Sequence, residues 1–165
     1  MFKVGDAIVH PTHGAGVIVG FKDFKDNGSA TRYYKIKLLK RTNTSLMVPV
    51  QEVEDHGIRR AIAKNHLSQV WFVLNGEPQK LPDNYKSRHR LLEEKLDAGN
   101  ILEIAEAVRD IAWRQHESSL TDKGKQIYRR GMMLLAGELA AVQESGLADA
   151  EAQVRTKLRE SLLAQ

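Results

Sequence analysis

The sequence contains no cysteine and few aromatic residues, which make up 6% of its 165 residues. The lack of cysteine excludes a disulfide framework, a thiol nucleophile and a zinc site with cysteine ligands. No stretch approaches the roughly 18 consecutive apolar residues of a membrane span. The N-terminal residues Met1 to Val4 show neither the basic region nor the apolar core of a signal peptide. We therefore expect a cytoplasmic protein with no membrane role.

Motifs of catalysis and of metal binding are also missing. The glycines of GAGVIVG fall at 14, 16 and 20, and a strand pattern follows them where a dinucleotide-binding fingerprint requires a helix. His10 and His13 lie in one turn region without a third ligand, so turn histidines are a better interpretation than a metal pair. P-loop, HExxH and GxSxG motifs do not occur. We expect no enzyme activity, no cofactor and no bound metal.

The hydrophobic pattern changes near residue 56. Before it, apolar residues alternate over two positions in short segments, and turn residues separate these segments at 11–16, 26–28 and Thr42-Asn43. This pattern is typical of four or five short strands, which most simply curl into a small barrel. The sequence thus predicts an N-terminal β domain over residues 1–56.

After residue 56 the apolar residues recur every three or four positions, which indicates helices. Pro82-Asp83-Asn84 is suited to open a helix, Asn100 and Thr121 are suited to cap helix starts, and Gly76 and Gly99 are suited to follow helix ends. The predicted helices cover residues 57–74 as one or two pieces, 84–98, 101–116, 121–144 and 149–163. The fold class is therefore α+β, with a small β-barrel followed by an all-α domain over residues 57–165.

Basic residues gather at two of the predicted helix starts. Basic side chains and free amide groups at helix starts suit phosphates. The ordinary alternative is that these basic residues form a solvated helix face. However, Tyr85 lies among the basic residues at the first of these helix starts, and an aromatic among cations can lie against a sugar or a base step. Asp83 is the single acidic residue between Lys80 and Arg90. The two groups are Lys80, Lys86, Arg88, His89 and Arg90, and then Lys123, Lys125, Arg129 and Arg130.

At these residues the chain resembles a known family. The segments FKVGDAIVHPTHGAGVI, MVPV, GIRRAI, LEEKLDAGN, IAEAVRDIAW and LTDKGKQIYRRGMMLLAGELA follow one another between residues 2 and 145. They are similar to those of the CarD/CdnL family of bacterial transcription regulators. The resemblance implies a Tudor-like or SH3-like N-terminal domain that binds the β subunit of RNA polymerase. It further implies a helical domain that contacts promoter DNA at the upstream edge of the bubble and stabilises the open complex.

The resemblance also implies particular contact residues. The polymerase contact falls on Phe24 and Lys25 and on Met47, through edge-strand pairing that needs backbone amides more than side chains. Many family members carry Trp where Tyr85 stands. Tyr offers less area to a base step, so we expect its wedge to be weaker by about 1 kcal/mol. The DNA contact falls on Tyr85, Lys86, Arg88, Arg90, Lys125 and Arg129.

Two alternatives remain open for the function. A non-specific DNA-binding protein would need only the basic groups, and a protein-only adaptor would make no direct DNA contact. We expect a monomer that is associated with the nucleoid through RNA polymerase and has little sequence specificity, because phosphate and minor-groove contacts distinguish bases poorly.

Overall fold

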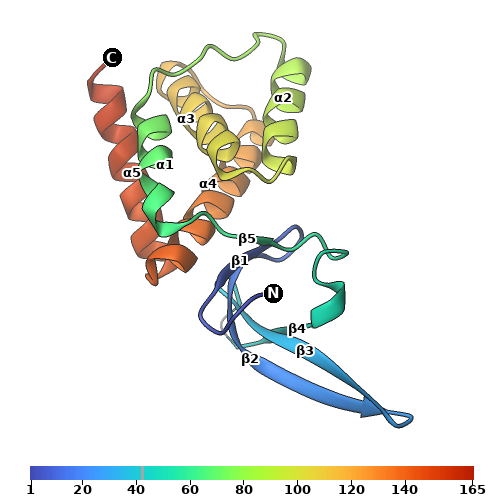
Figure 1. Cartoon of the computed structure of the whole chain (residues 1–165). Helices are drawn as coiled ribbons and strands as arrows, with labels where there is room; N and C mark the ends of the chain where they lie inside the picture. The colour runs from blue at the N-terminus through green and yellow to red at the C-terminus, as the bar shows by residue number, and fades with distance from the viewer. Residues whose placement is uncertain (42) are drawn as a thin grey trace. The chain divides into compact units, whose positions relative to one another are not determined.

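The computed structural model describes residues 1–41 and 43–165 (Figure 1). These residues divide into two compact units. Unit 1 comprises Met1–Ile62 and Gly137–Leu147, and unit 2 comprises Ala63–Ala136 and Ala148–Gln165. The described residues form an antiparallel sheet of five strands followed by five α-helices, which confirms the predicted α+β class.

The sheet of unit 1 has the strand order β4-β3-β2-β1-β5, and every pair of neighbours is antiparallel. A short 3-10 helix, η1 (Val50–Glu52), follows β4. The strands are β1 (Ala7–His10), β2 (Gly14–Asp26), β3 (Ser29–Leu38), β4 (Ser45–Pro49) and β5 (Arg59–Arg60).

Tight turns connect the strands where the sequence predicts them. Asn27 and Gly28 have φ angles of 48° and 84° and form a two-residue connection between β2 and β3, which is the usual Asn-Gly hairpin. Gly16 is required for a different reason, because a Cβ there would lie 2.8 Å from the carbonyl oxygen of Lys37. The turn predicted at Thr42-Asn43 includes Thr42, which lies outside the described residues.

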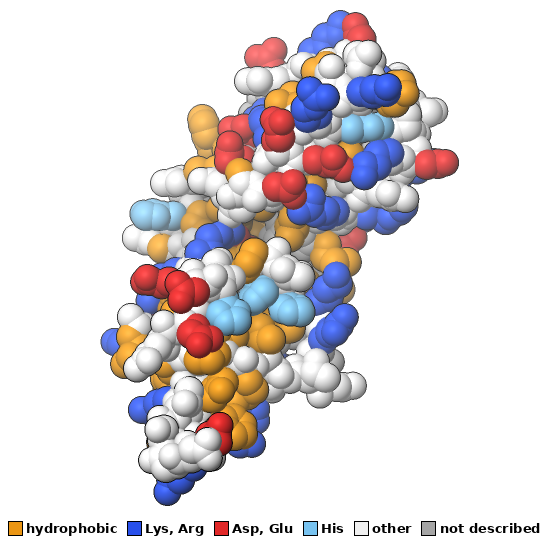
Figure 2. All heavy atoms as spheres, turned by 90° about the vertical axis from the view of Figure 1, so that its right-hand side faces the viewer, with side chains coloured by type: hydrophobic (Ala, Val, Ile, Leu, Met, Phe, Trp, Pro, Cys, Tyr) orange, Lys and Arg blue, Asp and Glu red, His pale blue; other side chains and the backbone are white. Residues whose placement is uncertain are grey.

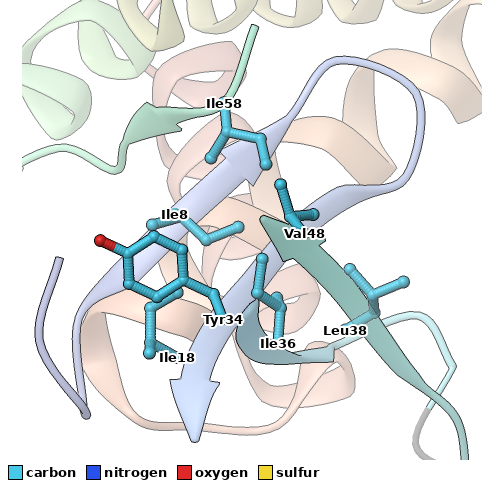
Figure 3. Packing of buried hydrophobic residues seen from close by; sticks show 7 residues of the cluster. All are labelled: Ile8, Ile18, Tyr34, Ile36, Leu38, Val48 and Ile58. Carbon is cyan, nitrogen blue, oxygen red and sulfur yellow. The ribbon is translucent and has the colours of Figure 1, made fainter. Parts of the chain in front are cut away.

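One apolar core lies within unit 1, and Figure 3 shows its side chains pointing toward one another from several strands. Along β3, buried residues alternate with exposed ones from Tyr34 to Leu38, because successive side chains of a strand point to opposite faces. The Tyr34 hydroxyl accepts a hydrogen bond of 2.9 Å from the backbone N–H of Phe2, which satisfies the buried polar group. The core residues are Ile8, Ile18, Tyr34, Ile36, Leu38, Val48 and Ile58.

The prediction of a helix beginning at residue 57 is wrong for its first part. Arg59 and Arg60 pair with Val9 and Ile8 as strand β5. The N–H of Ala61 then donates to the carbonyl of Ala7. Backbone donors that a helix would use are thus taken by an edge of the sheet, a long-range partner that local periodicity cannot indicate. A 3-10 turn, η2 (Lys64–His66), leads into the first α-helix.

The other helices agree closely with the predicted ranges. The Asn84 side chain accepts a hydrogen bond from the N–H of Ser87, and Asn100 accepts from those of Leu102 and Glu103. Thr121 accepts from the N–H of Gly124 at 3.0 Å. These caps confirm the predicted helix starts. The helices are α1 (Leu67–Asn75), α2 (Tyr85–Asp97), α3 (Ile101–Glu117), α4 (Asp122–Gln143) and α5 (Leu147–Leu163).

Helix α3 supplies much of the core of unit 2, since most of its residues from Ile104 to Ala112 are buried. Its Asp110 carboxylate accepts hydrogen bonds of 2.8 Å from Arg109 Nε and of 2.9 Å from the N–H of Gln79. The bond from Gln79 attaches the connection between α1 and α2 to α3, and that connection leads to Tyr85. Among the described residues, no helix combines the length and the apolar character that a membrane crossing requires.

Candidate functional site

The first candidate surface is the long β2–β3 hairpin of unit 1, which extends beyond the shorter strands (Figure 1). Strand β1 pairs with β2 only as far as Val17, and the backbone of Gly5 and Asp6 reaches Ile18. After a bulge at Val19, β2 pairs from Gly20 to Asp26 with β3 alone among the described residues. This stretch therefore presents a free strand edge, which is a template for strand addition.

The hairpin closure shows which backbone groups lie on that edge. Asp26 pairs with Ser29 around a two-residue turn, and such a closing pair is hydrogen-bonded. Hydrogen-bonded and non-hydrogen-bonded pairs alternate along an antiparallel ladder. The N–H and C=O of Phe24 therefore point to β3, whereas those of Lys25 point to the free edge.

Met47 lies on β4, at the opposite edge of the sheet. It pairs with Lys35, whose own backbone groups point to β2 by the same alternation, so the N–H and C=O of Met47 point away from β3. The next outward-facing residue on β4 is Pro49, which has no N–H to leave unpaired. Lys25 and Met47 thus present backbone groups on two different edges.

The side chains of Phe24 and Met47 nevertheless share a face. Cross-strand partners lie on the same face of a sheet, and the pairs Lys22–Tyr33, Tyr33–Pro49 and Lys35–Met47 follow from the register. Phe24 is 43% exposed and packs edge-on against Tyr33 at 5.1 Å between ring centroids. We call the residues Phe24, Tyr33, Met47 and Pro49 the outer apolar face, since it lies opposite the core.

The second candidate surface begins at the start of α2 in unit 2. Tyr85 is the first residue of this helix, is 54% exposed, and lies edge-on to His89 at 6.0 Å. Lys86 and Arg90 are exposed one turn apart, and no ion pair engages either of them within the described part of the chain. An exposed aromatic ring and two free cations thus lie at one helix start, as the sequence indicates.

Arg88 is arranged differently, because its side chain is buried. Only 6% of the residue is exposed, and its Nη1 donates to the carbonyls of Pro82 and Asp83 at 3.1 and 3.0 Å. Burial, together with the charge of Arg114, lowers the pKa of the Arg88 guanidinium. Arg88 lies four residues before the buried Leu92 and therefore on the same helix face. This spacing is the sequence signal that could have indicated the burial of Arg88. In this structure it holds the loop that precedes Tyr85.

A hydrogen bond joins the start of α2 to the start of α4. His89 Nε2 lies 3.0 Å from the Thr121 hydroxyl oxygen, and that oxygen accepts from the N–H of Gly124. The Thr121 hydroxyl can then donate its own proton to Nε2 of a neutral His89 ring. Burial lowers the pKa of His89, which favours this neutral form. The two basic groups that are separate in sequence therefore meet in unit 2.

Acidic residues of α2 neutralise part of the second group. Lys123 Nζ lies 2.8 Å from Glu93, and Arg130 Nη2 lies 2.6 Å from Asp97. Figure 2 shows this mixture, with Asp and Glu side chains among the Lys and Arg side chains over the part of unit 2 that carries α2. Lys125 and Arg129 are exposed, and no ion pair of the described residues involves them. The cations available to a ligand at α4 are thus Lys125 and Arg129.

The histidines at the Gly-rich turn have a local structural role. His10 is buried, and its Nδ1 accepts from the N–H groups of Thr12 and His13 at 3.0 and 3.1 Å. Burial lowers the pKa of His10, and the nearby His13 and His56 lower it further. In the described part of the chain, no group of three or more potential ligands is arranged to hold a metal ion.

Free strand edges in unit 1, and an exposed aromatic among cations in unit 2, are features of proteins that bind other macromolecules. Family models support a more specific assignment: the CarD-like/TRCF RID domain matches residues 2–62, and the CarD C-terminal domain matches residues 69–155. The chain is also 29% identical over 146 residues to "Putative transcription factor YdeB" of Bacillus subtilis (strain 168), covering 87% of this chain and 93% of that protein. The chain belongs to the CarD family of transcription factors, as the sequence predicts, and membership implies an interaction with RNA polymerase.

Proposed function

We propose that the protein regulates transcription by bridging RNA polymerase and promoter DNA. Unit 1 binds the β subunit of the polymerase, and unit 2 contacts DNA near the upstream edge of the bubble and stabilises the open complex. The observation that carries the proposal is the exposed Tyr85 at a helix start that is joined through His89 and Thr121 to a second basic helix start. The proposal places the protein in the cytoplasm, on the nucleoid with RNA polymerase.

The polymerase contact uses strand addition. The outward N–H and C=O of Lys25 supply backbone hydrogen bonds to an extended partner segment, and Phe24 and Met47 supply apolar contact from the outer apolar face. Neither Phe24 nor Met47 is charged, so the contact depends on backbone pairing and apolar area rather than on ion pairs at these positions.

The DNA contact uses phosphates and one aromatic ring. Lys86, Arg90, Lys125 and Arg129 neutralise phosphates, and Tyr85 lies against a sugar or wedges at a base step in the minor groove. Arg88 acts indirectly, because its hydrogen bonds to Pro82 and Asp83 hold the loop that precedes Tyr85.

Two weak contacts become effective because one chain carries both. Once one unit is bound, the other encounters its partner at a high effective concentration. The open complex gains stability only by the difference between the DNA contact with separated strands and the contact with closed duplex. The proposed role therefore requires Tyr85 and its neighbouring cations to bind the open form better.

Co-purification of RNA polymerase with the full chain tests the polymerase half. Lys25→Pro removes an outward N–H without taking a hydrogen bond from the β2–β3 ladder, so the hairpin is expected to fold and polymerase capture is expected to fail. Lys25→Ala, the matched control, keeps the N–H and is expected to capture polymerase normally. Normal capture by the folded Lys25→Pro variant would show that this edge is not the contact.

Met47→Pro blocks the other edge in the same manner. This variant is expected to capture at least part of the normal amount of polymerase. The reason is that Met47 is proposed to contribute an apolar side chain to the contact and no backbone hydrogen bonds. If Met47→Pro abolishes capture and Lys25→Pro does not, the partner strand pairs with β4. If the chain captures no polymerase, and if it binds promoter duplex equally well with and without polymerase, the result favours the alternative of a non-specific DNA-binding protein.

A further inference from the structure

Unit 2 contains a pocket that the proposed function does not use. It has a volume of about 290 Å³ and lies where α3, α4 and α5 meet. This size is near the lower limit of small-molecule sites, which span roughly 300–1,000 Å³, so it suits a compact ligand. The lining residues are Ala112, Gln115, His116, Tyr128, Arg155, Leu158, Arg159 and Leu162.

The walls of the pocket combine an apolar part with hydrogen-bond donors. Ala112, Leu158 and Leu162 provide apolar surface, whereas Arg155 and Arg159 lie one helical turn apart on α5. Arg155 is partly neutralised by Glu151, whose Oε1 lies 2.7 Å from its Nη2. Arg159 has no ion-pair partner among the described residues. The charge of the pocket is therefore positive.

Tyr128 adds a neutral donor to these cations. Burial raises the pKa of its hydroxyl, so the phenol keeps its proton at neutral pH and can donate a hydrogen bond. No hydrogen bond from the Tyr128 hydroxyl occurs to another described residue. A phenol and an unpaired guanidinium around apolar surface are the groups that recognise an anionic oxygen on an apolar body.

The C-terminal part of this lining lies outside the family match. The match to the CarD C-terminal domain ends at residue 155, whereas Leu158, Arg159 and Leu162 follow it. The pocket also shares no residue with the proposed DNA contacts Tyr85, Lys125 and their neighbours. The proposed function therefore does not account for this pocket, and three of its lining residues lie beyond the family match.

We propose that this pocket binds a small organic anion, a carboxylate or phosphate that carries a compact apolar group. The anionic oxygens pair with Arg159 and accept from Tyr128, and Arg155 is shared between the ligand and Glu151. The apolar group packs on Leu158 and Leu162. The proposal stands independently of the DNA and polymerase contacts.

A nuclear magnetic resonance titration of the isotopically labelled full chain tests the proposal with defined probes. The probes are 1-naphthyl phosphate, 1-naphthoate and the uncharged 1-naphthol. Saturable shifts are expected at Tyr128, Arg155 and Arg159 for the two anions, and binding of 1-naphthol is expected to be about tenfold weaker because it lacks the charge-assisted hydrogen bonds. The ratio between the two anions distinguishes a phosphate site from a carboxylate site.

Arg159→Gln is expected to weaken binding of the preferred anion about tenfold, and Arg159→Lys less. Lys64→Gln, an exposed charge change on η2 outside both the pocket and the proposed DNA contacts, is the control and is expected to leave the affinity unchanged. A thermal midpoint within the range of the unaltered chain shows that each variant is folded. The proposal fails if no probe saturates, if 1-naphthol binds as well as the anions, if the shifts centre on the starts of α2 and α4, or if Arg159→Gln retains full affinity.

Discussion

Glu138 and Arg59, which are 79 residues apart in the sequence, form a bidentate ion pair with Oε1–Nη2 and Oε2–Nη1 distances of 2.6 and 3.0 Å. The N–H of Ile62 donates a third hydrogen bond, of 2.8 Å, to Oε2. The Glu138 side chain is only 2% exposed, whereas that of Arg59 is 34% exposed. Within unit 1, this carboxylate fixes β5 and the residues that follow it to the C-terminal part of α4.

Glu138→Gln is expected to destabilise unit 1 by about 3 kcal/mol, at the lower end of the losses measured for broken buried ion pairs, because water can reach Arg59. The amide cannot accept from Arg59 and Ile62 as the carboxylate does. Urea unfolding measures the change. Asp23→Asn, which breaks the exposed 3.8 Å pair with Arg32, is the control and is expected to cost less than about 1 kcal/mol. Equal losses in both variants would contradict the structural role given to Glu138.

The stability of unit 1 is expected to fall as the pH decreases from 7 to 5. The folded state disfavours protonation of His10, because burial and the nearby His13 and His56 lower its pKa below the ordinary value of 6.5. The stability that depends on an unprotonated His10 is therefore fully present above pH 6.5, the ordinary pKa of the unfolded state. It is lost as the pH falls through that value toward the lower pKa of the folded state. Unfolding free energies at several pH values measure the slope.

His10→Asn keeps an acceptor for the N–H groups of Thr12 and His13 but does not titrate in this range. This variant is expected to show a smaller loss of stability between pH 7 and 5. The control His66→Asn removes an exposed histidine and is expected to keep the full slope. A slope that His10→Asn leaves unchanged would exclude His10 as its source.

The basic residues of unit 2 are expected to differ in their effect on DNA affinity. Arg90→Gln and Lys125→Gln each remove one phosphate contact, so each is expected to reduce the slope of log affinity against log salt by about 0.9 on any duplex sequence. Neither substitution should change the stability of the unit, since both side chains are exposed. Fluorescence anisotropy of a labelled promoter duplex over a range of salt concentrations measures the slope.

Arg88→Gln is expected to act through stability instead. It removes two hydrogen bonds from a buried guanidinium to Pro82 and Asp83, and each such bond to a charged group contributes about 1.5–3 kcal/mol. The expected result is a lower unfolding midpoint with an unchanged salt slope. A reduced salt slope at full stability would instead place Arg88 on the DNA.

Local signals in the sequence predict much of this fold. Asn84, Asn100 and Thr121 cap the helices that their positions indicate, and Asn27-Gly28 closes the predicted hairpin. Such features depend on neighbours within a few residues, so a single sequence carries them.

Long-range partners explain what the sequence does not predict. Strand β5 forms because Arg59 and Arg60 meet β1, and the pair of Arg59 with Glu138 spans 79 residues. The charge of Lys123 is engaged by Glu93 of another helix, and that of Arg130 by Asp97 of the same helix as Glu93. A list of basic residues therefore overstates the cations that a ligand can reach, and only tertiary contacts distinguish them.

The lifetime of open promoter complexes tests the central claim most directly. Complexes formed with the cognate RNA polymerase and the full chain are challenged with heparin, and their decay is timed for the unaltered chain, for Tyr85→Ala and Tyr85→Trp, and for the control Phe72→Ala, which removes an 80% exposed aromatic from α1.

The account predicts that the unaltered chain and Phe72→Ala prolong the lifetime equally, that Tyr85→Ala loses most of the effect, and that Tyr85→Trp extends it about fivefold, which corresponds to about 1 kcal/mol. A folded Tyr85→Ala variant that prolongs the lifetime as well as the unaltered chain does would contradict the account.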